Sequence, residues 1–380
     1  MKRILKLFKM IGLTILSLIV LVVVIGALFI NLSPQFGGKA TDSQKANYAK
    51  YDNYADGKFI NEVEANMDMG AGNMLKVMRE FLRSDPSRQP GEPQPIETIT
   101  SQALEQNPDS VTRVSWFGHS AFLLQIDGVN LLLDPMLGKT PSPHPWMGTK
   151  RYTDQLPINI EELPHIDAVL ISHDHYDHLD YESIVKLRDK VDAFFVPLGV
   201  GAHFVRWGVP EEKITEHNWW EESQFEGLTL ACTPARHFSG RGLTDRMTTL
   251  WSSWVIIGQQ DTIYFSGDSS YGPHFKEIGE KYGPFDFAMM ECGQYNKMWK
   301  DVHMMPEETA QAGVDVKAKL LMPIHWGAFT LALHSWTDPI ERVSKKAKEL
   351  GLTITTPKIG EPIFLRKESF PTEPWWEDVK

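Results

Sequence analysis

The 380-residue sequence predicts an α/β fold that follows a single N-terminal transmembrane helix. From about residue 111 onward, short apolar runs alternate with helical stretches and turn residues separate them, which is typical of an α/β sandwich. Ahead of this region, residues 11–30 contain no charged side chain, and a helix of that length spans about 30 Å of hydrocarbon. The composition, 42% hydrophobic and 23% charged, agrees with a folded globular protein.

The charge and the cysteine content exclude several classes of protein. A net charge of −11 argues against a nucleic-acid-binding protein, because phosphate contacts need a surplus of Lys and Arg. The two cysteines, Cys232 and Cys292, are too few for a disulfide scaffold and wrongly spaced for a thiolate zinc cluster. We therefore expect no nucleic-acid partner.

The apolar segment 11–30 is interpreted as an uncleaved membrane anchor. Residues 1–10 form a basic tail, whereas the next charged residue beyond the apolar segment is Lys39. By the positive-inside bias, we expect a single-pass protein of the cell membrane whose main domain lies on the extracytoplasmic side. A cleaved signal peptide is the alternative, although its apolar region would be unusually long and no A-x-A site follows it. The basic residues of the tail are Lys2, Arg3, Lys6 and Lys9.

Residues 31–109 are expected to form a spacer and an N-terminal arm. Apolar residues at helical spacing predict a short amphipathic helix at about residues 73–83. We expect its apolar face to pack against the main domain, and a membrane-facing surface is the alternative. The prolines in residues 85–95 indicate a linker or surface arm. The apolar positions of the helix are Met74, Leu75, Met78, Phe81 and Leu82.

The main domain is assigned to residues 110–367, and a C-terminal tail follows at residues 368–380. The dipeptide Asp127-Gly128 between two apolar runs predicts a β-hairpin. Strands are predicted at residues 121–126, 129–133, 168–171, 193–196, 228–232, 254–257, 262–265 and 287–290, and helices at residues 181–187, 274–282, 306–314 and 339–350.

Residues 168–180, AVLISHDHYDHLD, hold the most informative pattern of the sequence. An apolar strand ends and four potential metal ligands follow at once, and neutral imidazoles with a carboxylate suit zinc and related divalent ions. Alternate residues that leave a strand point the same way, so His173 and His175 can converge on one ion. Asp177 and His178 then turn toward a second ion. A His-rich surface loop is the alternative interpretation.

Two ions need more ligands than this loop supplies, and three further candidates follow predicted strands. His237, Asp268 and His325 each stand where a strand gives way to a loop, the position from which α/β sheets present functional groups. Taken singly, each is as consistent with an ordinary polar loop residue as with a metal ligand. Together with the first motif they form a specific set.

This ligand set resembles that of the metallo-β-lactamase superfamily. Over residues 114–333 the chain is similar to the branch that contains the N-acyl-phosphatidylethanolamine-hydrolysing phospholipase D. The resemblance implies a four-layer αβ/βα sandwich with metals at one edge of its two sheets. The similar segments are WFGHS at 116–120, LDP at 133–135, SPHPWMGTKRY at 142–152, NWWEE at 218–222, EIGEKYGPFD at 277–286 and IHWGAFTLA at 324–332.

The resemblance implies a cofactor of two zinc ions, although iron and manganese accept the same ligand types. A zinc-bound water with its pKa lowered to about 7 supplies hydroxide, which would attack the phosphorus of a phosphodiester. Asp268 would serve both as a bridging ligand and as a catalytic residue that accepts a proton. By this similarity one zinc is held by His173, His175 and His237, the other by Asp177, His178 and His325, and Asp268 bridges them.

Three further residues are candidates for the site. Arg241 aligns with a basic residue of the phospholipase branch and is expected to grip a substrate phosphate, with an exposed loop arginine as the alternative. His303 precedes a Pro-Glu-Glu helix start, as a similar histidine does in other superfamily members, and is a catalytic candidate. His119 is expected to be a hydrogen-bonded structural histidine or to orient a metal ligand.

We therefore expect a membrane-anchored di-zinc metallohydrolase that cleaves a phosphodiester, with N-acyl-phosphatidylethanolamine as the substrate and phospholipase D-type chemistry. Its partners would be this phospholipid and the membrane that holds the N-terminal helix. One alternative is a zinc-dependent lactonase or another carboxylic ester hydrolase. A second alternative is a non-catalytic metal-binding protein of the envelope.

Overall fold

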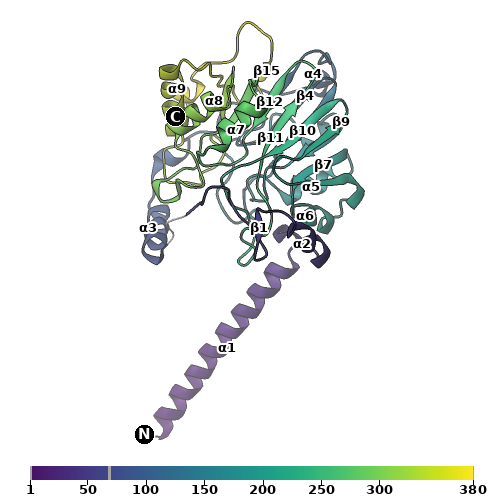
Figure 1. The fold of residues 1–380 in the computed structure, drawn as a ribbon. Coiled ribbons are helices and arrows are strands. Elements are labelled where there is room, and N and C mark those ends of the chain that lie inside the picture. Colours follow the sequence, from purple (N-terminus) through teal and green to yellow (C-terminus); the bar gives the residue numbers. More distant parts are fainter. Residues whose placement is uncertain (1, 67–69, 380) are drawn as a thin grey trace.

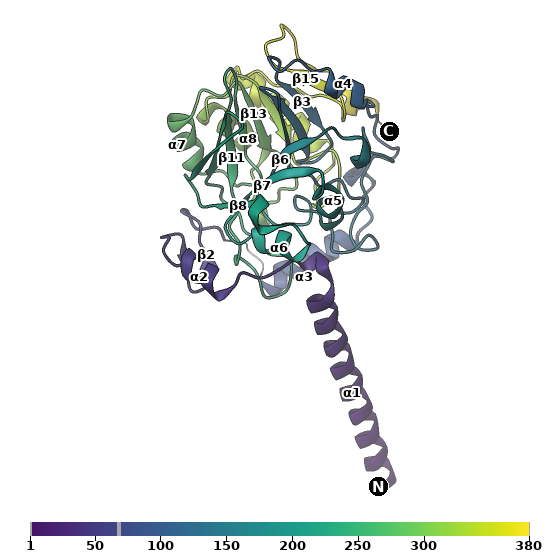
Figure 2. The same cartoon turned by 90° about the vertical axis from the view of Figure 1, so that its right-hand side faces the viewer.

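The computed structural model describes residues 2–66 and 70–379, and its main body consists of two mixed β-sheets packed face to face (Figures 1 and 2). In spatial order, the first sheet contains β15 (Pro362–Phe364), β3 (Arg113–Trp116), β4 (Phe122–Ile126), β5 (Val129–Leu133), β6 (Ile166–Leu170), β7 (Val191–Pro197) and β8 (Ile214–His217). The second contains β14 (Leu321–Ile324), β13 (Phe287–Glu291), β12 (Thr262–Phe265), β11 (Ser253–Ile257), β10 (Leu228–Thr233) and β9 (Glu222–Phe225).

Helices cover the outer faces of both sheets, which confirms the predicted four-layer αβ/βα sandwich (Figure 1). The first sheet carries α5 (Tyr181–Leu187) and α6 (Gly201–Arg206), where the Phe204 ring packs 5.0 Å from that of Phe194 in β7. The second carries α7 (His274–Lys281), α8 (Pro306–Asp315) and α9 (Asp338–Leu350). The remaining helices and the short hairpin are α1 (Lys2–Leu32), α2 (Asp42–Tyr48), α3 (Ala71–Leu82), α4 (Ser101–Glu105), β1 (Tyr54–Ala55) and β2 (Lys58–Phe59).

The predicted hairpin joins β4 and β5. Ile126 pairs with Val129 across the turn, and both turn residues have positive φ, 51° at Asp127 and 81° at Gly128. Positive φ at both central residues is the geometry of a type I′ turn, whose twist matches that of the strands. β5, β6 and β10 are each buried except at one residue, and the loops that follow their carboxyl ends run toward one edge of the sandwich.

Within residues 2–66 and 70–379, one helix, α1, is long and apolar enough to cross a membrane over Arg3–Leu32, and it projects from the body as an isolated rod (Figure 1). The predicted segment 11–30 lies inside it. Its C-terminal end is held by the main domain through backbone carbonyls. The Arg206 guanidinium donates to the carbonyls of residues 31, 33 and 37, and Trp207 Nε1 donates to that of Pro34 at 2.7 Å.

The N-terminal arm packs on the body more closely than a spacer would. Tyr48 at the end of α2 is 3% exposed and donates to Glu216 Oε2 at 2.8 Å, and Phe59 in β2 is fully buried. The predicted helix at 73–83 is confirmed as α3. Its apolar face is largely exposed rather than packed on the domain, because within the described chain only Val77 among its apolar side chains joins a core cluster.

The C-terminal segment, which we expected to be a peripheral tail, also contributes to the core. Trp375 and Trp376 are 3% and 5% exposed, and the Trp375 ring stacks on Trp326 with centroids 5.6 Å apart. Trp375 Nε1 donates to the carbonyl of Pro357. The tail therefore closes the region beside β14 and anchors the chain end to the sandwich.

Replacing this buried indole tests that role. We expect Trp375→Ala to lower the free energy of unfolding by about 3–5 kcal/mol, because it removes a buried aromatic side chain and leaves a cavity. Urea denaturation of the detergent-solubilised chain, followed by near-UV circular dichroism, measures the change. Glu377→Ala, at an exposed position of the same segment, is the matched control and should leave the midpoint unaltered. Equal midpoints for the two variants would contradict a structural role of the tail.

Candidate metal centre

The expected ligands meet at one edge of the sandwich because each follows the carboxyl end of a strand. The loop after β6 supplies the 173–178 motif, and the loops after β10, β12 and β14 supply His237, Asp268 and His325. β12, β13 and β14 are parallel to one another, as are β5 and β6, so their carboxyl ends point the same way. All seven residues lie in groups whose ligand atoms are within 4.8 Å of one another.

The first group brings three imidazoles and one carboxylate together. His173 Nε2 lies 2.9 Å from His175 Nδ1, and His237 Nε2 lies 3.2 Å from that same atom. Asp268 Oδ2 is 3.8 Å from both His173 Nε2 and His237 Nε2. Three ring nitrogens and an oxygen thus converge on one point, which is the arrangement of a tetrahedral N/O metal site.

The second group lies on the other side of Asp268. His178 Nε2 is 3.7 Å and His325 Nε2 is 3.8 Å from Asp177 Oδ2. Asp268 Oδ1 is 3.1 Å from His178 Nε2 and 3.1 Å from His325 Nδ1. Asp268 therefore offers one oxygen to each group, as a carboxylate shared between two ions would.

Two buried atoms of this cluster test whether it fits cations. In the described part of the chain, His178 Nε2 and Asp268 Oδ1 have no hydrogen-bond partner although both are buried. Buried polar atoms are almost always satisfied in native proteins, so such a pair, facing each other at 3.1 Å, calls for a further partner. A divalent cation supplies one, because imidazole nitrogen and carboxylate oxygen are ligands of zinc and related metals.

Burial sets the protonation of most of these groups. It lowers the pKa of His173, His237 and His325 well below the usual value, and that of His175 to about 4, which keeps the rings neutral. Burial also raises the pKa of Asp268 to about 6. Neutral imidazoles expose the lone pairs that a metal requires.

His178 and Asp177 behave differently because of their neighbours. Burial alone would lower the pKa of His178, but three surrounding carboxylates outweigh it and raise that pKa well above the usual value. Those carboxylates belong to Asp134, Asp177 and Asp268. Burial alone would raise the pKa of Asp177, but the adjacent imidazoles outweigh it and hold that pKa low. The site thus gathers negative charge that a cation can balance.

Hydrogen bonds from outside the ligand set hold the rings. Asp134 Oδ2 accepts from His178 Nδ1 at 2.6 Å, and the carbonyl of Val302 accepts from His237 Nδ1 at 2.7 Å. Our sequence analysis missed the role of Asp134. The sequence holds the same indication for Asp134 as for the ligands, because this aspartate directly follows the end of β5 in the segment LDP. These contacts fix the ring orientations.

His119 lies where the sequence analysis expected a supporting histidine. Its Nε2 is 2.9 Å from Asp177 Oδ2, and its ring centroid is 4.0 Å from that of His325. His119, Asp134 and His325 all have positive φ, at 56°, 38° and 67°. Non-glycine residues in this region cost of order 1–3 kcal/mol each and cluster at functional sites.

The other two candidates occupy different positions. His303 adjoins the cluster: Glu291 Oε1 lies 2.8 Å from its Nδ1, and its ring stacks on His325 at 5.4 Å. Arg241 is 3% exposed, and its guanidinium donates to the backbone carbonyls of Gln35, Asp174 and Leu179. The alternative that Arg241 is an exposed loop residue is therefore wrong, because its guanidinium is directed inward to these carbonyls.

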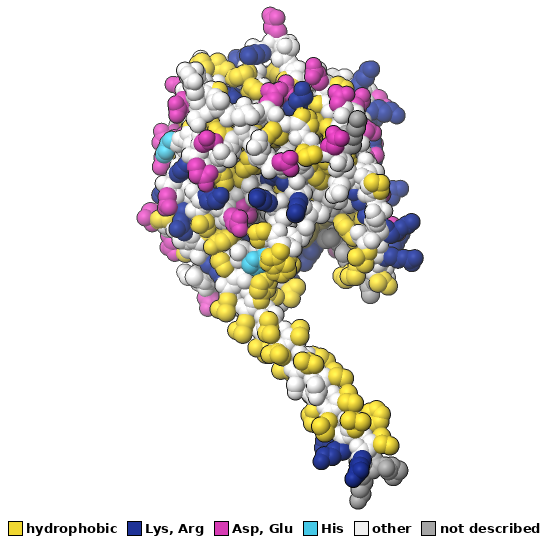
Figure 3. Space-filling view, turned by 180° about the vertical axis from the view of Figure 1, so that it is seen from behind, with side chains coloured by type: hydrophobic (Ala, Val, Ile, Leu, Met, Phe, Trp, Pro, Cys, Tyr) yellow, Lys and Arg dark blue, Asp and Glu magenta, His cyan; other side chains and the backbone are white. Residues whose placement is uncertain are grey.

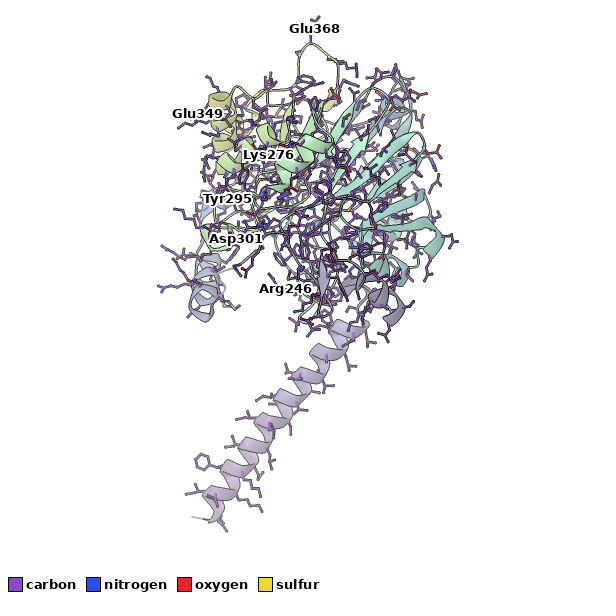
Figure 4. The ribbon with its side chains drawn as sticks, viewed as in Figure 1. Arg246, Lys276, Tyr295, Asp301, Glu349 and Glu368 are labelled. Atoms are coloured by element: carbon purple, nitrogen blue, oxygen red, sulfur yellow. The ribbon has the colours of Figure 1, made fainter. Side chains whose placement is uncertain are left out.

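An arginine that the sequence analysis did not single out lies near the centre, separated from the ligands by the ring of Phe238. The Arg246 guanidinium is 4.0 Å from the ring centroid of Phe238, whose ring in turn lies 4.5 Å from that of His175. Figure 4 places Arg246 on the underside of the body, between α3 and the point where α1 joins the body. The sequence carries no sign of this position, because the contact depends on how the loop folds.

Comparisons with known proteins agree with the geometry. The family described as the β-lactamase superfamily domain matches residues 129–326. An uncharacterized protein of Mycobacterium tuberculosis is 41% identical over 334 residues, covering 85% of this chain and 87% of that protein. The N-acyl-phosphatidylethanolamine-hydrolyzing phospholipase D 1 of Caenorhabditis elegans is 35% identical over 249 residues, covering 62% of this chain and 69% of that enzyme.

A solved structure supports the same fold. The isothiocyanate hydrolase from Delia radicum gut bacteria superposes with a TM-score of 0.53 at 21% identity, covering 66% of this chain and 98% of that one. At this identity the likeness concerns the fold alone. Members of the superfamily bind divalent metals, often two, and this chain has a His/Asp cluster that could hold such ions. The chain therefore belongs to the β-lactamase superfamily, and it is a metal-dependent hydrolase with the metallo-β-lactamase fold.

Proposed function

We propose that this hydrolase is a membrane-anchored di-zinc phosphodiesterase that cleaves N-acyl-phosphatidylethanolamine in the manner of a phospholipase D. The observation that carries the proposal is the pair of ligand groups on either side of Asp268, which offers one oxygen to each. Paired metals a few ångströms apart suit in-line displacement at phosphorus. The similarity to the Caenorhabditis elegans phospholipase D supports the choice of substrate.

In this proposal the seven expected residues hold the two ions, with Asp268 between them. When bound, the ions supply hydroxide at neutral pH and neutralise charge on the phosphodiester oxygens. Water then adds its oxygen to phosphorus, the bond from phosphorus to the ethanolamine oxygen breaks, and phosphatidic acid and an N-acylethanolamine leave. One ion would be held by His173, His175 and His237, and the other by Asp177, His178 and His325.

His303 and Arg246 are assigned supporting tasks in this reaction. Glu291 holds the His303 ring through Nδ1, which leaves Nε2 as the ring atom that would take the proton released by the attacking water and pass it to the departing ethanolamine oxygen. His303 also shares a group with Asp268 and His325. Arg246 places positive charge near the centre, where a lipid phosphate would enter. Arg241, whose donors meet backbone carbonyls, is assigned to the support of the metal loop instead.

The membrane location belongs to the same proposal. α1 would anchor the chain as a single-pass protein, with the metal centre on the extracytoplasmic side as the basic tail indicates. A reporter fused to the C-terminus and active in only one compartment tests this orientation. The anchor would keep the centre next to the lipid that it hydrolyses.

A substrate panel tests the reaction. We expect the zinc-loaded full chain to convert N-acyl-phosphatidylethanolamine in mixed vesicles into phosphatidic acid and N-acylethanolamine, as measured by mass spectrometry. A chelator should abolish the turnover and added zinc should restore it. Acyl-lactones tested in parallel provide the comparison. Turnover of lactones alone would replace the phosphodiesterase by a lactonase, and metal binding without any turnover would favour a non-catalytic protein.

Removing the shared carboxylate tests the arrangement of the metals. We expect two zinc ions per wild-type chain, whereas Asp268→Ala should bind fewer and lose turnover, because it removes an oxygen from each ligand group. Elemental analysis and the lipid assay measure the two effects, and far-UV circular dichroism monitors folding. Asp189→Ala, whose side chain is 87% exposed, is the control. A folded Asp268→Ala variant with wild-type turnover is incompatible with the assignment.

A milder change tests the support of His178. We expect Asp134→Asn to weaken zinc affinity or turnover by about 10–100-fold, because an amide accepts less strongly from His178 Nδ1 than a carboxylate does. Competition with a chromophoric chelator measures the affinity. Asp189→Asn makes the same chemical change at the surface and should have no effect. If both variants behave as wild type, Asp134 has no part in orienting the ligand.

A further inference from the structure

The apolar face of α3 is not covered by the rest of the described chain. Leu75 is 67% and Leu82 is 82% exposed, and the three other apolar side chains on this face are 43–55% exposed. Residues three and four apart lie on one side of a helix, so these five form a continuous apolar stripe. An exposed stripe of this kind marks an interaction site. The three other side chains are those of Met74, Met78 and Phe81.

The opposite side of α3 is basic. Lys76, Arg79 and Arg83 are exposed and lie at the same helical spacing on the polar side. Glu80 alone provides a carboxylate in this stretch, and it is 3.6 Å from Arg83. An apolar stripe with Lys and Arg on the other face is typical of a helix that lies in the plane of an anionic membrane surface.

α3 lies at the same end of the body as the exit of α1 (Figure 1). Seen from behind, hydrophobic side chains gather on the lower side of α3 and around the point where α1 leaves the body. Lys and Arg lie on the outer side of α3 (Figure 3). A second exposed aromatic belongs to this end: Trp146, 75% exposed, stacks on His144, which contacts Phe29 of α1. Tryptophan favours the headgroup layer of a bilayer.

An apolar cluster connects α3 with the metal centre. Val77 of α3 packs into the cluster built around Trp299, Val302 and Ala332, and Phe238 belongs to the same cluster. The Phe238 ring lies 4.5 Å from that of His175 and 4.8 Å from that of His237. Apolar side chains thus lead from the exposed helix to the ligands without a break.

We propose that α3 is a second membrane contact, which lies in the headgroup layer of an anionic bilayer beside α1 and, through this cluster, holds the metal centre next to the bilayer from which lipid enters. The position of its apolar face at the end of the body from which α1 projects and the basic side chains on its other side both fit a bilayer. The entry of lipid and the membrane location of α1 rest on the proposed function, whereas the insertion of α3 can be measured without any turnover.

Site-specific labelling tests the insertion directly. Cys232 and Cys292 are fully buried, so single cysteines introduced by Leu75→Cys or Leu82→Cys can carry an environment-sensitive fluorophore. Lys76→Cys reports on the polar side of α3, and Leu350→Cys reports on the end of α9, beside Glu349 and far from α1 (Figure 4). The full chain is reconstituted into vesicles of equal parts phosphatidylcholine and phosphatidylglycerol.

We expect blue-shifted emission from labels at 75 and 82, with quenching by lipids that carry a spin label near the top of the acyl chain. Labels at 76 and 350 should show solvent-like emission without quenching. Solvent-like emission at 75 and 82 overturns the proposal. Shielding of these labels that is insensitive to spin-labelled lipid but rises with protein density also overturns it, in favour of a second copy of this chain.

Turnover in vesicles tests the entry of lipid. The double variant Leu75→Ser/Leu82→Ser should hydrolyse N-acyl-phosphatidylethanolamine in vesicles about tenfold more slowly than wild type, because it removes apolar area from the bilayer contact. Leu350→Ser, which removes an exposed leucine from α9, is the matched control. Equal rates for both variants refute the entry route. An inactive wild type refutes the proposed function, and labelling still decides whether α3 inserts.

Discussion

The balance of charge at one edge of the sandwich is the constraint on which the rest of the structure depends. Three carboxylates and several imidazoles are withdrawn from water there, and the cost of burying an ionised carboxylate is large unless opposite charge lies close by. In the chain itself that opposite charge falls on His178, whose pKa rises accordingly. Divalent cations held by the proposed ligands would replace this proton with a stronger and more localised charge.

The two sheets make such an edge possible. Parallel neighbours end together, so loops from different parts of the chain deliver polar side chains to a single point while the strands behind them remain apolar. The rings are then oriented from behind by groups such as Asp134 and the carbonyl of Val302. The left-handed backbone at His119 and His325 shows that the surrounding packing enforces this geometry locally.

Much of this could be predicted from the sequence, because strand ends and turn residues leave local signals. The hairpin at Asp127-Gly128 and the strands that precede the ligands follow from apolar runs alone. What could not be predicted depends on tertiary burial. Amphipathic spacing showed that α3 has an apolar face but not what covers it, and a short segment that follows two prolines gave no sign that Trp375 is buried. The sequence could not predict, either, that backbone carbonyls surround the Arg241 guanidinium.

The attachment of α1 to the domain has a mechanical consequence. A flexible tether would let a domain swing over a wide arc, but here the carbonyls of Asn31, Ser33 and Pro34 are clamped by Arg206 and Trp207. These contacts tie the orientation of α1 to that of the domain. If the rod spans a bilayer, a change of bilayer thickness alters its tilt, and the metal edge rotates by the same angle. The local lipid composition would then set the angle at which the metal edge faces the bilayer.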